Sequence, residues 1–319
     1  MANKSQMNNI DIEQYAKQFK RDLETSNDVA NINSYIKFHI AFPKNRTILA
    51  IDIGGTNFRI AEVCFDENGT PTISNRKECH MPGSIGEKEI SIDDFFTFLA
   101  KEISYYPEEK VGLCFSYLCE ILENLDGRII SFSKEVKISG GENKLLGVEI
   151  NKKLKEMGQK ERSFSVINDT VACMLGTEGA NVGLILGTGF NICYREKNNN
   201  DYIINSEAGR YRGFPTEDFD FGPMVEQKIS GAYLRPLLEV HPEMQNEIYD
   251  RGSRMIAIEL ISLYRHMNEK LKIAVEGSVF YNVKEIRDGI NKYLNEYKVD
   301  YEILDGRDKI LIGAAVATI

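Results

Sequence analysis

The chain of 319 residues lacks several features that would place it in a specialised class of protein. It contains no apolar run approaching the length of a membrane span, and its first residues lack the apolar segment of a signal peptide. Its six cysteines have no metal-binding spacing and lie mostly in apolar segments, where cysteine packs as a small hydrophobic residue. We therefore expect a reduced, cytoplasmic protein that does not span a membrane.

Positive charge is also scarce. The chain has 39 Lys and Arg against 48 Asp and Glu, which gives a net charge of −9 and a pI near 5.2. This balance argues against nucleic acid or an anionic membrane as a partner. An acidic protein that binds a polyanion needs local basic groups or a divalent cation. The length is sufficient for a large core and favours two lobes.

Two similar glycine-rich turns are the most informative feature present. The first is Asp52-Ile53-Gly54-Gly55-Thr56-Asn57, and the second is Gly187-Thr188-Gly189-Phe190-Asn191. Each connects two apolar segments, and Thr56 and Thr188 lie 132 positions apart (188 − 56). Glycine allows close approach of the backbone to an anion, and successive N–H groups of a turn can bind phosphate. Either turn alone is ordinary turn chemistry, but the pair predicts two similar lobes that bind one polyphosphate between them.

Apolar periodicity predicts the same order of elements, βββαβαβα, in both halves. In the first half we predict strands at 47–53, 57–65, 72–78, 111–117 and 163–167, and helices at 12–25, after Ser91, at 145–157 and at 170–176. In the second half we predict strands at 182–186, 191–196, 202–204, 272–275 and 301–304, and helices near 217–238, 252–268, 283–297 and 311–319. This order indicates an α/β protein with mixed sheets and helices on their faces. The predicted parts are 1–44, 45–175 and 176–319, with a lobe boundary near 170–181.

Polar residues follow several of the predicted strands. Asp52 precedes a glycine turn, where it could hold a hydrated Mg²⁺ or serve a structural role. Asp169 follows a strand, where it could accept a proton from a substrate hydroxyl, although helix capping is the alternative. Lys134 could bind a hydroxyl or a phosphate, or be a solvated surface residue.

The second half contains further candidates. Glu207 and Glu226 could accept hydrogen bonds from sugar hydroxyls, although both also suit an exposed surface. Gly277-Ser278 ends a predicted strand and could accept a nucleoside, or be an ordinary turn.

Taken together and in this order, these motifs resemble those of the hexokinase family of sugar kinases, which share the fold of actin and the Hsp70 ATPase. The resemblance covers most of the sequence. It includes both glycine turns, Ser116 with Ser133-Lys134, Asn168-Asp169-Thr170, Asn205-Ser206-Glu207 and Glu226, and the C-terminal Gly313-Ala314-Ala315.

The resemblance implies two RNase H-like lobes with an interlobe cleft, and ATP-dependent phosphorylation of a hexose, most simply glucose, at its 6-hydroxyl. It implies that Mg²⁺ accompanies ATP, that Asp52 contacts the metal through water, and that sugar binding closes the lobes. Asp169 would be the catalytic base, with Lys134 beside it. The implied substrate-binding residues are Ser116, Ser133, Lys134, Asn168, Asp169, Asn191, Glu207 and Glu226. The implied cofactor-binding residues are Asp52, Gly54, Gly55, Thr56, Asn57, Arg59, Gly187, Thr188, Gly189, Gly277 and Ser278.

The chain departs from the family pattern at several points. Ser116-Tyr117-Leu118 replaces the usual Ser-Phe-Pro, and Pro223 stands where the family usually has a sugar-binding Gln. There is no Trp, and the segment between Tyr233 and Glu276 is shorter than in typical members of the family. Arg210 and Arg212 are unusual beside a sugar site, and we expect them to pair with Glu217 and Asp218. Another sugar (mannose, fructose or an amino sugar), another donor (GTP or polyphosphate) and a sugar sensor with little catalysis remain alternatives.

Overall fold

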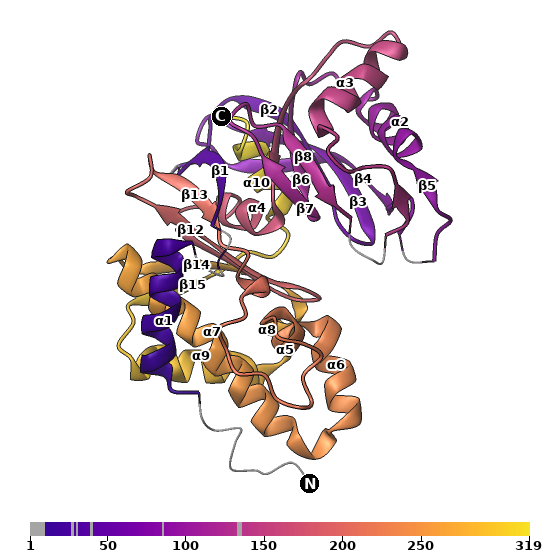
Figure 1. The fold of residues 1–319 in the computed structure, drawn as a ribbon. Helices are drawn as coiled ribbons and strands as arrows, with labels where there is room; N and C mark the ends of the chain where they lie inside the picture. The colour runs from indigo at the N-terminus through magenta and orange to yellow at the C-terminus, as the bar shows by residue number, and fades with distance from the viewer. Residues whose placement is uncertain (1–9, 27–28, 30, 39–40, 85, 133–135) are drawn as a thin grey trace. The chain divides into compact units, whose positions relative to one another are not determined.

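The computed structural model describes residues 10–26, 29, 31–38, 41–84, 86–132 and 136–319. The chain divides into two compact units, each made from two segments. Unit 1 contains residues 1–32 and 180–307, and unit 2 contains residues 33–179 and 308–319 (Figure 1). Within the described part of the chain, no helix has the length and apolar character needed to cross a lipid bilayer.

Unit 2 is built on a five-stranded sheet in the order β10-β6-β2-β3-β4. Strands β10, β6 and β2 run parallel, whereas β2-β3 and β3-β4 are antiparallel hairpins. The bounds are β2 Arg46–Ile53, β3 Asn57–Phe65, β4 Pro71–His80, β6 Lys110–Phe115 and β10 Ser163–Ile167. Two smaller sheets pair β5 (Ile90–Ser91) with β9 (Ile138–Ser139) and β7 (Leu118–Ile121) with β8 (Gly127–Ser131).

Helices cover both faces of this sheet. Helices α2 (Ile92–Ile103) and α3 (Leu146–Glu156) share one apolar core with Leu49, Ile51 and Ile53 of β2. Since side chains alternate along a strand, Asp52 lies on the opposite face. Helices α4 (Asp169–Leu175) and α10 (Ile310–Val316) pack against each other and against strands of the sheet. Helix α10 therefore reaches unit 2 from a distant part of the sequence.

Glycines allow α10 to approach its neighbours closely. A Cβ atom on Gly112 of β6 would lie 1.8 Å from the carbonyl oxygen of Ala314. A Cβ atom on Gly313 would lie 1.7 Å from the carbonyl oxygen of Ala172 in α4, and one on Gly176 would lie 2.1 Å from that of Lys309. No larger residue fits at these three positions without moving the backbone. They therefore fix α10 against both β6 and α4.

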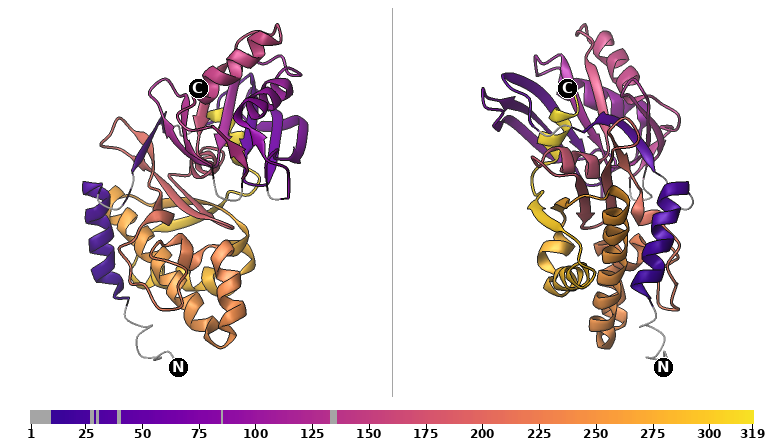
Figure 2. Two further views of the ribbon diagram at one scale, coloured as in Figure 1. Left: turned by 45° about the vertical axis from the view of Figure 1, so that its right-hand side comes forward. Right: turned by 90° about the vertical axis from the view of Figure 1, so that its left-hand side faces the viewer.

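Unit 1 is built on a sheet that contains its strands β13-β12-β11-β14-β15 in that order, and β11, β14 and β15 run parallel. These strands are β11 Val182–Leu186, β12 Phe190–Glu196, β13 Tyr202–Asn205, β14 Leu271–Glu276 and β15 Tyr301–Asp305. Strand β1 (Ile32–Lys37) begins at the last residue of the first segment of unit 1, and its other residues belong to unit 2. The helices of unit 1 are α1 Ile12–Thr25, α5 Glu226–Ile229, α6 Gly231–Val240, α7 Gln245–Met267, α8 Ser278–Asn282 and α9 Lys284–Glu296, with the short 3₁₀ helices η1 Ala208–Arg210 and η2 Pro242–Met244. The long helix α7 packs against both α1 and α9 (Figure 2).

Most elements predicted from periodicity are present. Residues 163–167 and 182–186 are strands, and α1 spans 12–25, all as predicted. Ser91 caps α2, with its Oγ accepting from Asp94 N at 3.1 Å. The prediction of one helix near 217–238 is wrong, because helix begins only at Glu226 and breaks at Ser230. The predicted connector before the first lobe contains β1, which the polar sequence conceals.

The units also divide the chain differently from the predicted ranges 1–44, 45–175 and 176–319. The change of unit between Gly179 and Ala180 lies within the predicted boundary region. However, α1 belongs to unit 1, although we predicted a separate N-terminal part at 1–44. Helix α10 belongs to unit 2, although we predicted it in the second lobe at 176–319. The reason is packing: the buried face of α1 (Ala16, Phe19 and Leu23) belongs to the core of unit 1, and α10 docks through the glycine contacts described above.

Helix α7 carries a carboxyl group with no partner in the core of unit 1. Glu259 is 0% exposed, and among the described residues neither of its carboxyl oxygens has a hydrogen-bond partner. Burial raises the pKa of Glu259 well above its ordinary value, because the charged form loses its hydration. The folded protein therefore favours the neutral acid.

We predict that Glu259 makes stability depend on pH. Because the pKa of Glu259 is raised in the folded protein, its contribution to the free energy of unfolding is most favourable at low pH. That contribution is lost as the pH rises above about 4.3, the pKa of Glu in the unfolded chain. Glu259→Gln cannot ionise, so this variant should lack that loss. It should be more stable than the wild type at pH 7 by at least about 1 kcal/mol, with a smaller difference at pH 4.5. Urea unfolding followed by circular dichroism measures this.

Glu247→Gln, on the first turn of the same helix, is the control and should leave the pH dependence unchanged. Identical pH dependence in wild type and Glu259→Gln would show that Glu259 does not titrate as predicted.

Candidate functional site

Three parallel strands of unit 2 end at the same edge of the sheet, and the candidate residues follow them. Ile53 of β2 is opposite Phe115 of β6, and Cys114 of β6 is opposite Ile167 of β10. Gly54, Ser116 and Asn168 are the next residues after these three strands, and Ser116 N donates to Ile53 O at 3.1 Å. The topology thus brings together candidates that are more than 110 residues apart in the sequence.

The first glycine turn leaves N–H groups available for a ligand. Gly54 N donates to Asn57 O at 3.0 Å, and Thr56 O accepts from Met81 N at 2.8 Å. Within residues 41–84 and the other described segments, no acceptor is recorded for the N–H groups of Gly55 and Thr56. Adjacent unpaired amides in a glycine turn are suited to binding an anion.

Asp52 lies immediately before this turn and is almost fully buried. Its side chain is 6% exposed, and Oδ2 accepts from Arg59 Nη1 at 3.1 Å. Burial raises the pKa of Asp52, and the charge of Arg59 only partly offsets this. Arg59 also pairs with Glu78 at 3.1 Å. In the structure Arg59 binds these two carboxylates, and its contact with the nucleotide stays a prediction.

Asn168, not Asp169, is the N-cap of α4. Asn168 Oδ1 accepts from Thr170 N at 2.8 Å, whereas Asp169 is the first helical residue, and its Oδ1 accepts from Thr170 N at 2.7 Å. The charges of Asp52 and Asp169 both add to the effect of burial in raising the pKa of Cys114. Both carboxylates therefore lie near the same thiol. Asp169 is half-buried in the first turn of α4.

The second glycine turn, in unit 1, repeats the pattern of the first. Gly187 N donates to Gly189 O at 3.0 Å, Gly187 O accepts from Gly231 N at 2.7 Å, and Thr188 O accepts from Ala232 N at 3.1 Å. For the N–H groups of Thr188 and Gly189, no acceptor is recorded in the described chain. Gly277 packs against this turn: a Cβ atom there would lie 2.3 Å from Leu186 C, so only glycine allows the approach.

Glu207 is held in an unusual conformation by two asparagines. Its φ of 49° is in the left-handed region, which a residue with a side chain enters at a cost of roughly 1 kcal/mol or more. Asn205 Nδ2 donates to Glu207 Oε1 at 2.7 Å, and Asn191 Nδ2 donates to Asn205 Oδ1 at 2.8 Å. The strain and the hydrogen bonds together fix the direction of this carboxylate.

Glu226 lies beside the second glycine turn. Its Oε1 accepts from Phe190 N at 3.3 Å, and a Cβ atom on Gly189 would lie 2.9 Å from the same oxygen. Burial raises the pKa of both Glu207 and Glu226, and the charge of Glu207 raises that of Glu226 further. The structure thus places Glu226 beside the second glycine turn and within the electrostatic influence of Glu207.

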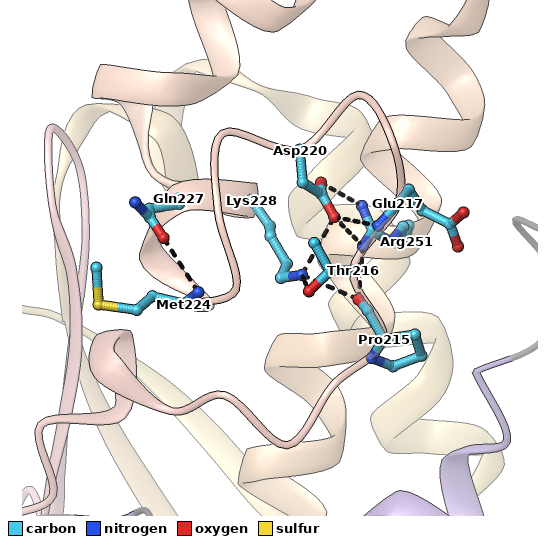
Figure 3. A network of polar contacts seen from close by, with 8 residues as sticks. All are labelled: Pro215, Thr216, Glu217, Asp220, Met224, Gln227, Lys228 and Arg251. Carbon is cyan, nitrogen blue, oxygen red and sulfur yellow. Dashed lines mark hydrogen bonds and ion pairs between the residues drawn. The ribbon is translucent and has the colours of Figure 1, made fainter.

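A buried ionic network fixes the chain that leads to Glu226 (Figure 3). The Asp220 side chain is 0% exposed and binds Arg251 at 2.7 Å and Lys228 at 3.1 Å. Lys228 also donates to Pro215 O at 2.9 Å and Thr216 Oγ1 at 3.0 Å. Burial alone would raise the pKa of Asp220, but the hydrogen bonds and charge of Arg251 lower it below its ordinary value. These contacts replace the helix predicted at 217–225.

Sequence reasoning missed some features of the site. The cross-strand role of Asn205 and the hydroxyl contact of Tyr117 with Gly54 O, at 2.8 Å, depend on distant pairing. Ser133 and Lys134 lie outside the described residues. The predicted pairing of Arg210 and Arg212 with Glu217 and Asp218 is wrong in the described chain. Instead, the charge of Arg210 acts on Glu207 and Glu226 and partly offsets the rise in their pKa that burial causes.

The residues present fit a water-mediated Mg²⁺ contact. Among the described residues there is no group of three or more His, Cys, Asp and Glu side chains that could hold a metal alone. Mg²⁺ keeps several waters and commonly binds one or two carboxylates together with substrate phosphates. Asp52, next to the available amides of the first turn, suits that role.

Comparisons with known proteins agree with this geometry. Hexokinase family models match residues 1–178 and 235–319. Human Hexokinase-2 is 26% identical over 314 residues, covering 87% of this chain and 34% of its own length. Hexokinase-1 of Schizosaccharomyces pombe is 31% identical over 165 residues, covering 47% of this chain and 33% of its own. The chain thus spans about a third or less of the curated relatives it matches.

Solved structures show the same fold. A hexokinase from Schistosoma mansoni complexed with glucose has a TM-score of 0.76 at 16% identity, covering 97% of this chain and 95% of that one. A ROK hexokinase from Thermus thermophilus has a TM-score of 0.60 at 15% identity, covering 86% of this chain and 98% of that one. The fold is that of the actin-like ATPases, as predicted. The chain belongs to the hexokinase family.

We predict that removing the charge of Glu207 will lower the pKa of Glu226. Glu207→Gln removes a like charge but leaves the burial of Glu226 unchanged, so the pKa should fall without reaching the value for exposed Glu. Titration of the Glu226 carboxyl carbon by NMR measures this. Glu296→Gln, exposed on α9, is the control. An unchanged or higher pKa of Glu226 in Glu207→Gln would contradict the coupling.

Proposed function

We propose that this protein transfers the γ-phosphoryl group of ATP to the 6-hydroxyl of a hexose, with glucose as the first candidate. Membership of the hexokinase family supports sugar phosphorylation. The observation that carries the proposal is one edge of the unit 2 sheet. Asp169 and the available amides of the first glycine turn come shortly after β10 and β2, which pair with the two sides of β6, and Asp52 lies near the end of β2. A general base and a phosphate-binding turn are the two parts that phosphoryl transfer requires.

In this mechanism Asp169 accepts the proton of the sugar 6-hydroxyl while the hydroxyl oxygen bonds to the γ-phosphorus. The bond between the γ-phosphorus and the bridging oxygen breaks, and ADP leaves. The N–H groups of Gly55 and Thr56 bind phosphate oxygens of the nucleotide, and those of Thr188 and Gly189 do the same from unit 1. Bound Mg²⁺ would neutralise phosphate charge, with Asp52 contacting it through water. The protein lowers the barrier mainly by positioning and charge stabilisation.

The carboxylates of unit 1 would hold the sugar. Glu207 and Glu226 accept hydrogen bonds from adjacent sugar hydroxyls, and Asn191 and Asn205 orient Glu207. Asn168, Ser116, Ser133 and Lys134 complete the proposed sugar contacts. Gly277 and Ser278 would face the nucleoside. Because the pKa of both glutamates is raised, they take up protons at a higher pH than exposed carboxylates do. As the pH is lowered, sugar affinity should therefore begin to weaken at a higher pH than it would with exposed carboxylates.

We predict that Asp169→Asn will lower kcat by about 10²- to 10⁴-fold, the usual contribution of a general base. Sugar affinity should change only a few-fold, because the amide can still accept a hydrogen bond. A coupled assay of ADP release with Mg·ATP and a panel of hexoses measures kcat, and calorimetry measures sugar binding. Asp93→Asn, an exposed acid in the first turn of α2, is the control and should be neutral.

The other possible outcomes distinguish between the proposed kinase and its alternatives. Full turnover by Asp169→Asn would rule out Asp169 as the base. Sugar binding by the wild type without turnover from any nucleotide or polyphosphate would indicate a sensor. Turnover with mannose, fructose or an amino sugar in place of glucose would revise the acceptor and retain the chemistry.

A further inference from the structure

The two glycine turns hold equivalent carbonyl groups with different donors. Gly54 and Gly187 are each the first residue after a parallel strand of their sheet, β2 and β11. Gly187 O accepts from a backbone amide, Gly231 N, at 2.7 Å. Gly54 O accepts from a side chain, the hydroxyl of Tyr117, at 2.8 Å. The first turn therefore depends on a single side-chain hydroxyl for a contact that the second turn makes through its backbone.

This carbonyl controls the direction of an amide that has no acceptor among the described residues. The oxygen of Gly54 and the N–H of Gly55 belong to one planar trans peptide group and point in opposite directions. A donor that holds the oxygen therefore also fixes the direction of the Gly55 N–H, for which the described residues offer no acceptor. In the second turn, Gly231 fixes the Thr188 N–H in the same way.

The Tyr117 ring is itself held firmly, so its hydroxyl is well placed. Tyr117 is 7% exposed, and its ring packs edge-on against Phe115 and Phe132, each with a centroid separation of 5.1 Å. Tyr117 follows Ser116, whose N–H is already bonded to Ile53 O. No other donor to Gly54 O is recorded in the described residues. Removal of the hydroxyl would leave the Gly54–Gly55 peptide free to rotate.

We propose that Tyr117 is a positioning residue for phosphate binding, whose hydroxyl orients the Gly54–Gly55 peptide so that the Gly55 N–H meets a phosphate oxygen of the nucleotide. This inference rests on the proposed function of the first turn as a phosphate site. Because Tyr117 directly follows Ser116, a proposed sugar contact, the same side chain also connects the sugar-binding segment to the phosphate-binding turn.

Tyr117→Phe tests this, because it deletes one oxygen and keeps the ring. We expect ATP to bind about 5- to 10-fold more weakly, as for loss of one well-oriented hydrogen bond. Adenosine, which has no phosphates, should bind as it does to wild type. In steady-state kinetics the KM for ATP should rise, with less effect on the KM for the sugar. Calorimetry with each ligand gives the affinities.

Tyr106→Phe is a matched control in the same unit. The hydroxyl of Tyr106 donates to a backbone carbonyl, Asn75 O, also at 2.8 Å, but on β4, away from the turn. This variant loses the same kind of bond and should bind ATP normally. A lower thermal midpoint in both variants with weaker ATP binding only in Tyr117→Phe would support positioning over general destabilisation.

Several results would overturn the proposal. Wild-type ATP affinity in folded Tyr117→Phe would do so, as would an equal loss of affinity for adenosine or in Tyr106→Phe. Failure of the kinase proposal is separate: wild type that binds ATP but phosphorylates no sugar would reject the reaction and leave the binding comparison valid. Wild type that binds neither ATP nor inorganic triphosphate would reject both.

Discussion

The close approach of α10 to β6 and α4 is the constraint on which the candidate site in unit 2 depends. Gly112, Gly176 and Gly313 bring backbone against backbone, with no side chain between. Helix α10 therefore sets the spacing between α4, which carries Asp169, and the sheet, which carries Asp52 and the first turn. A displacement of 1 Å at these contacts would be transmitted to the proposed base and the proposed phosphate-binding amides, and enzyme catalysis is sensitive to such errors.

Both units use the same means to present amides to a ligand. In each glycine turn, neighbouring donors hold the carbonyl groups, and the opposite sides of the same peptides are left available. The turns therefore need no basic side chain at the point of contact, which suits a chain with a net charge of −9. Basic side chains instead form buried ion pairs, as Lys228 and Arg251 do with Asp220 in the segment next to Glu226.

Much of the fold could be predicted from the sequence, because α1, β10 and β11 have clear periodicity and Ser91 is a local capping signal. Candidate site residues could be named from the sequence because many of them lie at or just after the end of a predicted strand, and their roles stay predictions. What could not be predicted depends on distant contacts. The Asp220 network suppresses a helix, the asparagine pairing holds Glu207 in a left-handed conformation, and α10 packs in a unit far from its neighbours in sequence.

The separation of unit 2 into two segments has a consequence for biosynthesis. Residues 33–179 emerge from the ribosome long before α10, which follows all 128 residues (307 − 179) of the second segment of unit 1. At typical translation rates of roughly 5–20 residues per second, the glycine surface of β6 and α4 waits on the order of ten seconds for its partner. During this time the surface of β6 and α4 that α10 covers in the folded protein has no helix packed on it. Protection by a chaperone, or slow closure around a late-arriving helix, would then decide the yield of active protein.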